Sequence, residues 1–258
     1  MMKSKRVVVI SDLHCGHATG LTPPDYNPNV KFDGEPAEHD YRSTLWKFYA
    51  DTITKLQPID YLIVNGDDIA GPNKRWGGRQ LIAVDVNQQV KMAADAIQFA
   101  RARNVYMSFG TPYHVGDSVD AESQIASQVG ARKIGAQDTL VVNGVAFNYR
   151  HHVGGSQSPM GRQTSLSREK VWNLLWHERG QVKADIILRS HVHYFQYGGD
   201  GHTLWMTTPA LQGLGDFFGS RMMSGVVDYG LVHFDVADGE YSWEPHLLNG
   251  KTLLRRST

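Results

Sequence analysis

The feature that most constrains the fold is a set of short apolar runs, each of which ends abruptly in polar residues. The first run, VVVI at residues 7–10, is followed at once by Ser11, Asp12 and His14. Four consecutive apolar residues are typical of a strand that is covered on both faces, as in parallel sheets. The polar end has two readings. Either Asp12 caps the following turn, or Asp12 and His14 are metal ligands at the end of a central strand.

Strands and helices are expected to alternate over the first half of the chain. Apolar runs within 60–67 and 104–110 predict two more buried strands, and helical spacing predicts helices over 45–56, ended by Pro58, and 86–103. This order predicts a parallel sheet with right-handed crossovers. A long loop is expected over 22–40 and a short helix over 120–130.

The second half of the chain has a different pattern. Two alternating runs flank Asn143-Gly144, which is a strong hairpin signal. A third long helix is predicted over 165–179, and strands over 184–193, 202–211, 230–236 and 241–248. We therefore expect a single domain, 1–258, with one mixed sheet or two stacked sheets.

Composition excludes some classes of function. Lys+Arg and Asp+Glu are both 26 in 258 residues, so bulk attraction to nucleic acid or to an anionic membrane is not expected. The single cysteine, Cys15, allows no intrachain disulfide, and no apolar run approaches the length of a membrane span. These observations favour a cytoplasmic protein without a membrane partner.

Histidine and aspartate recur where the predicted strands end. These residues are Asp12, His14, Asp67, His114, His151, His152, His191 and His193. In open α/β sheets ligands bind beyond the carboxyl ends of the strands, so these side chains are predicted to meet in a metal site. In extended chain, residues i and i+2 point the same way, as Asp12 and His14 would, and likewise His191 and His193. Asp67 has two oxygens and can bridge two ions, and imidazole with carboxylate suits Zn, Mn, Fe, Ni or Co.

Three of these segments, DLH, NGDD and SHVH, resemble the calcineurin-like metallophosphoesterase superfamily in their order and intervals. The resemblance spans Asp12 to His193 for the site and extends to about Tyr241 for the sheets. It implies two mixed β-sheets packed as a sandwich, flanked by helices, with a site for two divalent metal ions at one edge. Carried over by position, one ion is held by Asp12, His14 and His193. Asp67 bridges, and the other ion is held by His191 and either His151 or His152.

The segment after the third predicted strand departs from that superfamily. The usual Gly-Asn-His is replaced by GTPYH at residues 110–114. Thr111 stands where a ligating Asn is expected, and His114 lies two residues further on than the usual His. Either His114 becomes a metal ligand, or it keeps a general-acid role and the second ion lacks its amide ligand. The sequence leaves both readings open.

The expected activity is hydrolysis of a phosphomonoester or phosphodiester by a hydroxide that two metal ions activate. His114 would protonate the leaving oxygen or contact the phosphate, and Asp67 would act as the carboxylate that bridges the two ions. A metal-dependent nuclease and a non-catalytic metal-binding scaffold are the alternatives, with nucleic acid a less favoured partner than a small phosphate ester. The oligomeric state is not predicted.

The other polar residues are expected to have ordinary roles. Cys15 is a packed thiol, Asp68 supports the ligands, and the loop at 73–80 is either solvated or contacts substrate. The apolar, Gly-rich stretch at 214–223 fits core packing, a dimer contact or a cleft wall. Surface or strand positions are predicted for the remaining histidines, His17, His39, His177, His202, His233 and His246.

Overall fold

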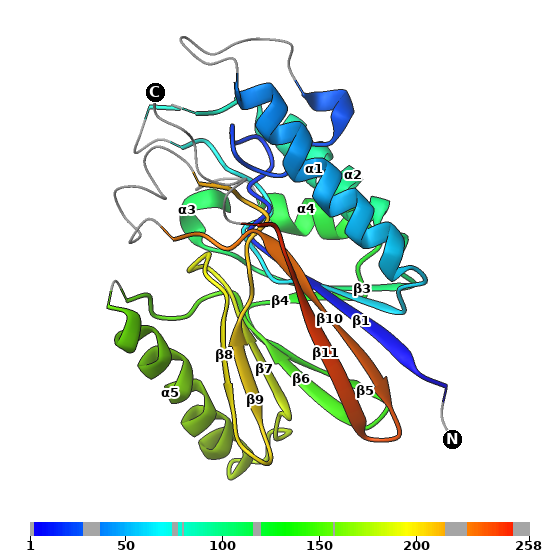
Figure 1. The fold of residues 1–258 in the computed structure, drawn as a ribbon, viewed down its shortest axis with the longest axis vertical. Helices are drawn as coiled ribbons and strands as arrows, with labels where there is room; N and C mark the ends of the chain where they lie inside the picture. The colour runs from blue at the N-terminus through cyan, green and yellow to red at the C-terminus, as the bar shows by residue number, and fades with distance from the viewer. Residues whose placement is uncertain are drawn as a thin grey trace.

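The computed structural model describes residues 3–27, 37–73, 77–78, 80–115, 120–156, 158–214 and 226–249. Within them lie two mixed β-sheets (Figure 1). The six-stranded sheet has the order β11-β10-β1-β2-β3-β4, and the five-stranded sheet has the order β5-β6-β7-β9-β8. Two sheets with helices outside confirm the predicted α/β sandwich.

The six-stranded sheet contains the alternating first half of the chain. Its parallel strands β1 to β4 are joined on one side by an antiparallel hairpin from the end of the chain. The strands are β1 (Lys5–Ile10), β2 (Tyr61–Val64), β3 (Asn104–Ser108), β4 (Lys133–Gly135), β10 (Gly230–Ala237) and β11 (Glu240–Leu247). Because β1 to β4 run in parallel, their carboxyl ends lie at one edge.

Helices cover the outer face of this sheet. They are α1 (Ala37–Leu56), α2 (Val86–Phe99) and α4 (Ala121–Gln128). An apolar cluster joins them to the sheet, with Leu45 and Tyr49 of α1 and Ile97 of α2 against Val8 and Leu62. Two shorter helices, η1 (Pro24–Tyr26) and α3 (Pro112–Val115), lie in the connections. The amphipathic spacing seen in the sequence is therefore the face that packs on the sheet.

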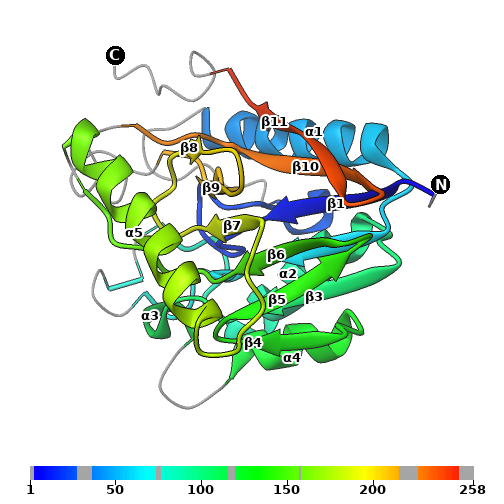
Figure 2. The same ribbon diagram turned by 90° about the horizontal axis from the view of Figure 1, so that it is seen from below.

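The second sheet consists of β5 (Asp138–Val142), β6 (Val145–Tyr149), β7 (Ile186–Arg189), β8 (Gln196–Gly199) and β9 (Leu204–Thr207). A second apolar cluster fills the space between the sheets, where Phe147 meets Phe234 at 5.2 Å between ring centroids. The outer helix α5 (Pro159–His177) packs on this sheet through Leu166, and it lies apart from α1, α2 and α4 in both views (Figures 1 and 2). The order of layers is helix, sheet, sheet, helix.

Most predicted elements occur, with differences at their ends. Both α1 and α5 begin several residues earlier than the apolar spacing indicated, and α2 ends at Phe99 instead of 103. The predicted loop at 22–40 contains η1 and the start of α1, and its residues 28–36 lie outside the described residues. The short elements β4, β8 and α3 were not predicted, because three or four residues carry no measurable periodicity. No described helix combines the length and apolar character that crossing a membrane requires.

Candidate metal centre

The predicted site residues follow the carboxyl ends of strands from both sheets. Backbone hydrogen bonds hold the ends together: the Asp12 N–H donates to the Gly66 carbonyl (2.9 Å), and the His14 N–H donates to the Asp67 carbonyl (3.0 Å). In the other sheet the Ser190 N–H donates to the His151 carbonyl (2.8 Å). Each sheet thus fixes its own ligand-bearing turns before any side chain is considered.

The geometric reason given for the Asp12–His14 and His191–His193 pairs is wrong. β1 ends at Ile10 and β7 at Arg189, so neither pair lies in extended chain. These four residues and Asp67 all have positive φ angles, between 43° and 74°. Non-glycine residues seldom adopt this left-handed conformation, and where they do the surrounding structure must hold it. The turns, and not the alternation of a strand, direct these side chains inward.

Asp12, His14 and His193 form the first group of candidate ligands. One ligand atom from each lies within 4.8 Å of the others, and the three side chains are almost completely buried. His193 Nε2 is 3.1 Å from Asp12 Oδ1 and 3.3 Å from His14 Nε2. Three such atoms at one point could hold a divalent ion.

Asp67, His151 and His191 form the second group, by the same 4.8 Å limit. His151 Nε2 is 3.0 Å from Asp67 Oδ2. Asp67 is also grouped with His14 and His114, so its carboxylate lies between the two ends of the site. This is the position that a bridging ligand needs.

His151 and His152, the two candidates from the end of β6, differ in placement. The His151 side chain is buried, and its Nδ1 lies 2.7 Å from the Asn65 carbonyl. Because a carbonyl only accepts, Nδ1 carries a proton, and Nε2 is the nitrogen that faces the site. His152 is exposed and belongs to none of the ligand groups found among the described residues, although its ring lies 4.9 Å from that of His191.

The chemistry of these atoms fits divalent cations. Among the described residues, Asp12 Oδ1 and His151 Nε2 are buried without a hydrogen bond of acceptable geometry, and they lie 3.9 Å apart. Two ring nitrogens, of His14 and His193, also face each other. Buried lone pairs turned toward one another are unfavourable unless a proton or a cation lies between them. Imidazole and carboxylate donors match first-row divalent metals.

Charges within the site shift the pKa values strongly. Burial opposes charging of the His151 ring, but the carboxylates of Asp67 and Asp12 outweigh it and raise the pKa of His151 to about 10. Burial likewise opposes ionisation of Asp67, yet His151 and His114 hold the pKa of Asp67 well below its usual range. Burial, with His151 nearby, lowers the pKa of His191 to about 4. Burial also opposes ionisation of Asp12, but His193 and His151 lower the pKa of Asp12, so Asp12 and Asp67 are both ionised at neutral pH, as carboxylate ligands must be.

Thr111 and Glu122 hold the candidate bridge. Thr111 donates to Asp67 Oδ1 from its N–H (2.6 Å) and from its hydroxyl (3.0 Å). Glu122 of α4 accepts the N–H groups of Asp67 (3.0 Å) and Gly110 (2.8 Å). Burial and the charge of Asp67 raise the pKa of Glu122 to about 7. Sequence reasoning missed Glu122, since an acidic residue in a first helical turn is ordinary.

Two glycines are required where these turns touch. Gly66 has φ +80°, and a Cβ there would lie 2.9 Å from the Cβ of His151. A Cβ on Gly110 would lie 2.2 Å from Asp67 Oδ1. Any side chain at either position would displace a candidate ligand, and the positive φ of Gly66 is itself a conformation that favours glycine.

A buried chain of hydroxyl and amide groups lies under the site and connects both sheets. The Thr208 hydroxyl contacts those of Ser11 (2.8 Å) and Ser190 (2.7 Å). Asn65 donates to Ser190 (2.6 Å), and Ser108 donates to Asn65 (2.8 Å). Ser11, Ser190 and Asn65 each come one or two residues before a candidate ligand. The sequence contained no signal for this network, because it forms only when the two sheets pack.

His114 is partly exposed, with 21% of its side chain accessible. Its Nδ1 lies 2.9 Å from the Ala70 carbonyl, so Nδ1 carries a proton and Nε2 faces the site. Nε2 is 3.8 Å from Asp67 Oδ2. An atom so placed can serve as a ligand or exchange a proton with a substrate oxygen.

The remaining predicted residues divide as follows. Cys15 is buried, and its thiol donates to the Leu21 carbonyl, which agrees with a packed thiol. Asp68 is buried next to the site, where burial and Glu122 raise its pKa well above the usual range. In the loop at 73–80, Lys74, Arg75, Trp76 and Arg79 lie outside the described residues, as do residues 215–223.

No family model matches the chain, and no curated protein matches it. Among solved structures it is similar to a single mutant of Vps29 from Entamoeba histolytica, with a TM-score of 0.48 and 13% identity over 95% of this chain and 99% of that one. It is also similar to an archaeal phosphodiesterase, with a TM-score of 0.45 and 12% identity over 93% of this chain and 99% of that one. A third similar structure is that of a Streptococcus pneumoniae protein described as a predicted phosphoesterase. Its TM-score is 0.43, with 10% identity over 100% of this chain and 96% of that one. The motifs resemble one superfamily, and the structure is similar to these three proteins.

Proposed function

We propose that this chain is a metal-dependent phosphoesterase with a site for two divalent ions. The observation that carries the proposal is that Asp67 is grouped with His14 on one side and with His151 and His191 on the other, so that it lies between donors from both sheets. Two groups joined by one carboxylate are what two ions about 3.5–4 Å apart require. In this proposal Asp12, His14 and His193 hold one ion, His151 and His191 hold the other, and Asp67 bridges them.

Two divalent ions in these groups would neutralise phosphate charge and lower the pKa of a bound water, which hydrolysis at neutral pH requires. The protein's own residues hold the candidate ligands in position. Thr111 and Glu122 fix Asp67 through its carboxylate and its backbone N–H. The Asn65 carbonyl fixes the His151 ring with Nε2 toward the site.

His114 is our candidate for the proton donor to the leaving oxygen or for a phosphate contact. Its partial exposure supports this role, because, of the ligands proposed above, only His191 is of intermediate burial, and Asp12, His14, Asp67, His151 and His193 are each at most 4% exposed. The Ala70 carbonyl accepts from Nδ1 and so directs Nε2 toward the place where a substrate oxygen would lie. A positioned donor of this kind contributes roughly 10²–10⁴-fold to rate.

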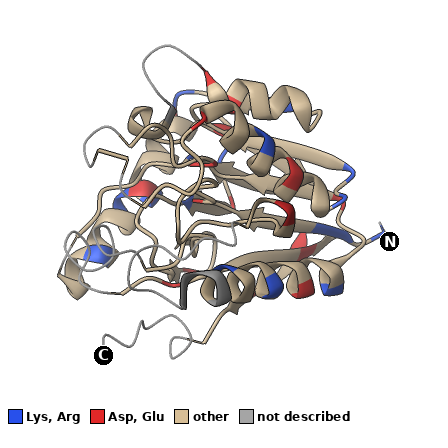
Figure 3. Cartoon of the chain, turned by 90° about the horizontal axis from the view of Figure 1, so that it is seen from above, with Lys and Arg blue, Asp and Glu red and all other residues tan. Residues whose placement is uncertain are grey.

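The charge distribution favours a small phosphate ester over nucleic acid. In Figure 3 the Lys and Arg positions of the described chain are mixed with Asp and Glu positions and do not gather on one side. A nuclease would be expected to present a continuous basic groove to the phosphate backbone. A nuclease and a non-catalytic scaffold therefore serve as outcomes of the test.

The test is hydrolysis by the purified full chain after reconstitution with Mn²⁺, Zn²⁺, Fe²⁺, Ni²⁺ or Co²⁺. Nitrophenyl phosphate, bis(nitrophenyl) phosphate and single-stranded DNA separate monoesterase, diesterase and nuclease activity. We expect metal-dependent turnover of a nitrophenyl ester, and we expect Asp67→Asn to lack it. Two bound ions without hydrolysis of any substrate would favour the scaffold and contradict the proposal.

A further inference from the structure

A second cluster of potential metal ligands lies on the β10–β11 hairpin, outside the site described above. His233 and Glu244 are directly opposite in the antiparallel register, and His246 is two residues further along β11. Side chains at i and i+2 of a strand share a face, so these three point to the same side of the sheet. That side is the one covered by α1, because Leu231 belongs to the same apolar cluster as the α1 residues Leu45 and Tyr49.

The ligand atoms of these three residues converge. One atom from each of His233, Glu244 and His246 lies within 4.8 Å of the others, the same limit that the central groups meet. His233 Nδ1 is 2.8 Å from His246 Nε2, and the rings stack with centroids 4.9 Å apart. The central site has the same approach of two ring nitrogens, between His14 and His193. A hydrogen bond between the two rings would explain why their nitrogens approach each other. A bound cation would also explain why the Glu244 carboxylate lies beside them.

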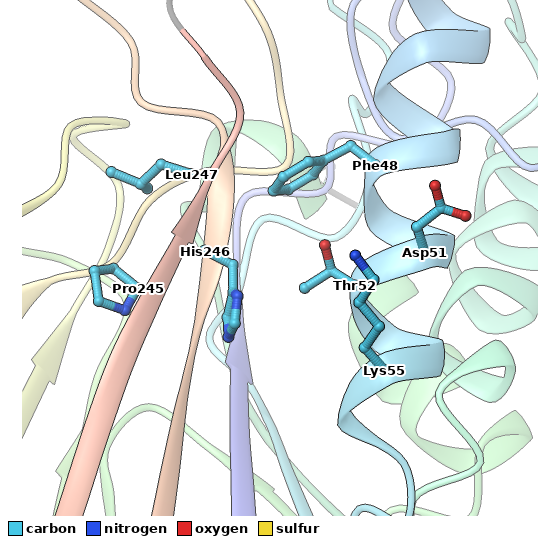
Figure 4. A pocket seen from close by; sticks show the side chains of 7 residues that line it. All are labelled: Phe48, Asp51, Thr52, Lys55, Pro245, His246 and Leu247. Atoms are coloured by element: carbon cyan, nitrogen blue, oxygen red, sulfur yellow. The ribbon is translucent and has the colours of Figure 1, made fainter.

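The surroundings position His233 and leave His246 accessible. His233 Nε2 is 3.7 Å from Asp235 Oδ2, and Arg6 holds that carboxylate through two N–H groups at 2.8 and 2.9 Å. A carboxylate next to the second ring nitrogen is a common arrangement behind metal-binding histidines. On the other side, His246 lines a pocket of about 400 Å³ between α1 and β11, together with Thr52 and Lys55 (Figure 4).

We propose that His233, Glu244 and His246 bind one divalent transition-metal ion, of the zinc, nickel or copper type, on the outer face of the hairpin. Two imidazole nitrogens and one carboxylate oxygen match these ions and do not match calcium or magnesium. Three protein ligands leave a coordination position for water. This ion would join β10 to the edge strand β11, and it is additional to the two ions of the proposed phosphoesterase centre.

The experiment counts bound Zn²⁺ after equilibrium dialysis of the full chain at a fixed micromolar concentration of free zinc. We expect His246→Ala to bind one ion fewer per chain than the unchanged protein. Glu244→Gln, at an exposed position that tolerates the change, should need a higher free zinc concentration to fill the same site. The matched controls are Ser242→Ala, on the same face of β11, and the exposed His202→Ala, and both should keep the full count.

Equal zinc stoichiometry and affinity in the unchanged chain, His246→Ala and Glu244→Gln would overturn the proposal. Circular dichroism checks that each variant is folded. If His246→Ala does not fold, the zinc affinity of Glu244→Gln tests the proposal instead. The result is independent of the proposed function, since the count does not use turnover. Hydrolysis of nitrophenyl phosphate should be unchanged in both hairpin variants, whereas a failed phosphoesterase proposal would leave every variant inactive.

Discussion

At the scale of single residues, Asp67 carries the most demanding role in the proposed centre. Its carboxylate contacts His151 and accepts two hydrogen bonds from Thr111 while its backbone N–H binds Glu122. Asp67→Asn removes the charge shared by both ions and keeps the shape. We expect turnover to fall to background and the metal content to drop, with the circular dichroism spectrum unchanged. Asp25→Asn, at an exposed position, is the matched control, and wild-type turnover with full metal occupancy in Asp67→Asn would refute the assignment.

The two histidines after β6 should differ sharply when each is replaced by alanine. His151 is buried with Nε2 turned to Asp67, whereas His152 is exposed. We therefore expect His151→Ala to lose metal and activity, and His152→Ala to retain both within about twofold, as surface substitutions usually do. Metal analysis of the two purified variants is the measurement. Equal, small losses in both would show that neither is a ligand.

His114→Ala tests the proton-donor role. If His114 protonates the leaving oxygen, the variant keeps both ions and loses roughly 10²–10⁴-fold in rate on an alkyl phosphate. The loss should shrink for a nitrophenyl ester, because nitrophenolate leaves without protonation. Rates on both substrates and the metal content are measured together. A missing ion in this variant would instead identify His114 as a ligand and contradict the donor assignment.

Residue types at strand ends were enough to predict which side chains gather, but not how they are held. The interactions of Thr111 and Glu122 with Asp67 depend on positive φ angles at the turns and on the packing of α4 against α2 and β4. Neither can be read from spacing along the chain. The hydroxyl network of Ser11, Thr208 and Ser190 likewise joins residues almost 200 positions apart.

At the scale of elements, one carboxylate ties the amino-terminal ends of three strands. Asp60 accepts from the Arg6 N–H (3.1 Å), Lys5 (3.2 Å) and Arg103 (3.1 Å), at the edge opposite the candidate site. Its side chain is 12% exposed. Replacing it with asparagine removes charged hydrogen bonds, so Asp60→Asn should lower the free energy of unfolding by about 1–3 kcal/mol at neutral pH.

The stabilisation by Asp60 should depend on pH in one direction. Burial opposes ionisation, but the Arg6 N–H and Lys5 outweigh it and lower the pKa of Asp60 below its ordinary value of 3.8. The contribution is therefore complete above that ordinary value and is lost as the pH falls through the lower pKa of the folded state. Urea unfolding of the unchanged chain and Asp60→Asn should show a gap that narrows on acidification. A gap that stays constant at acid pH would contradict this explanation.

Element types followed from periodicity, while element ends did not. The Asn143-Gly144 turn was predictable because both residues take positive φ, 45° and 89°, as a two-residue hairpin requires. The start of α5 at Pro159 was not, since its first turns lack an apolar face. Strand order was also beyond the sequence: β10 pairs with β1 across more than 200 residues.

At the scale of the whole molecule, the candidate site is where the two sheets meet. Asp12 and Asp67 follow strands of the six-stranded sheet, and His151, His191 and His193 follow strands of the other. The apolar cluster between the sheets, which includes Phe147 and Phe234, holds the two layers together away from this edge. Ions bound at the edge would be further cross-links between layers that apolar packing and the hydroxyl network of Ser11, Thr208 and Ser190 already hold together.

Removing the metal should therefore lower the stability of the entire fold. An ion at about 100 times its Kd stabilises the state that binds it by about 2.7 kcal/mol, and each kcal/mol shifts the Tm of a chain of this size by about 2–4 °C. We expect EDTA to lower the Tm of the metal-loaded protein by roughly 5–10 °C. Scanning calorimetry with and without EDTA measures the shift. The shift should be smaller in Asp67→Asn, which loses ions of the central site, than in His246→Ala, which loses only the hairpin ion. An equal shift in Asp67→Asn and the unchanged chain would show that the ions responsible do not bind where the two sheets meet.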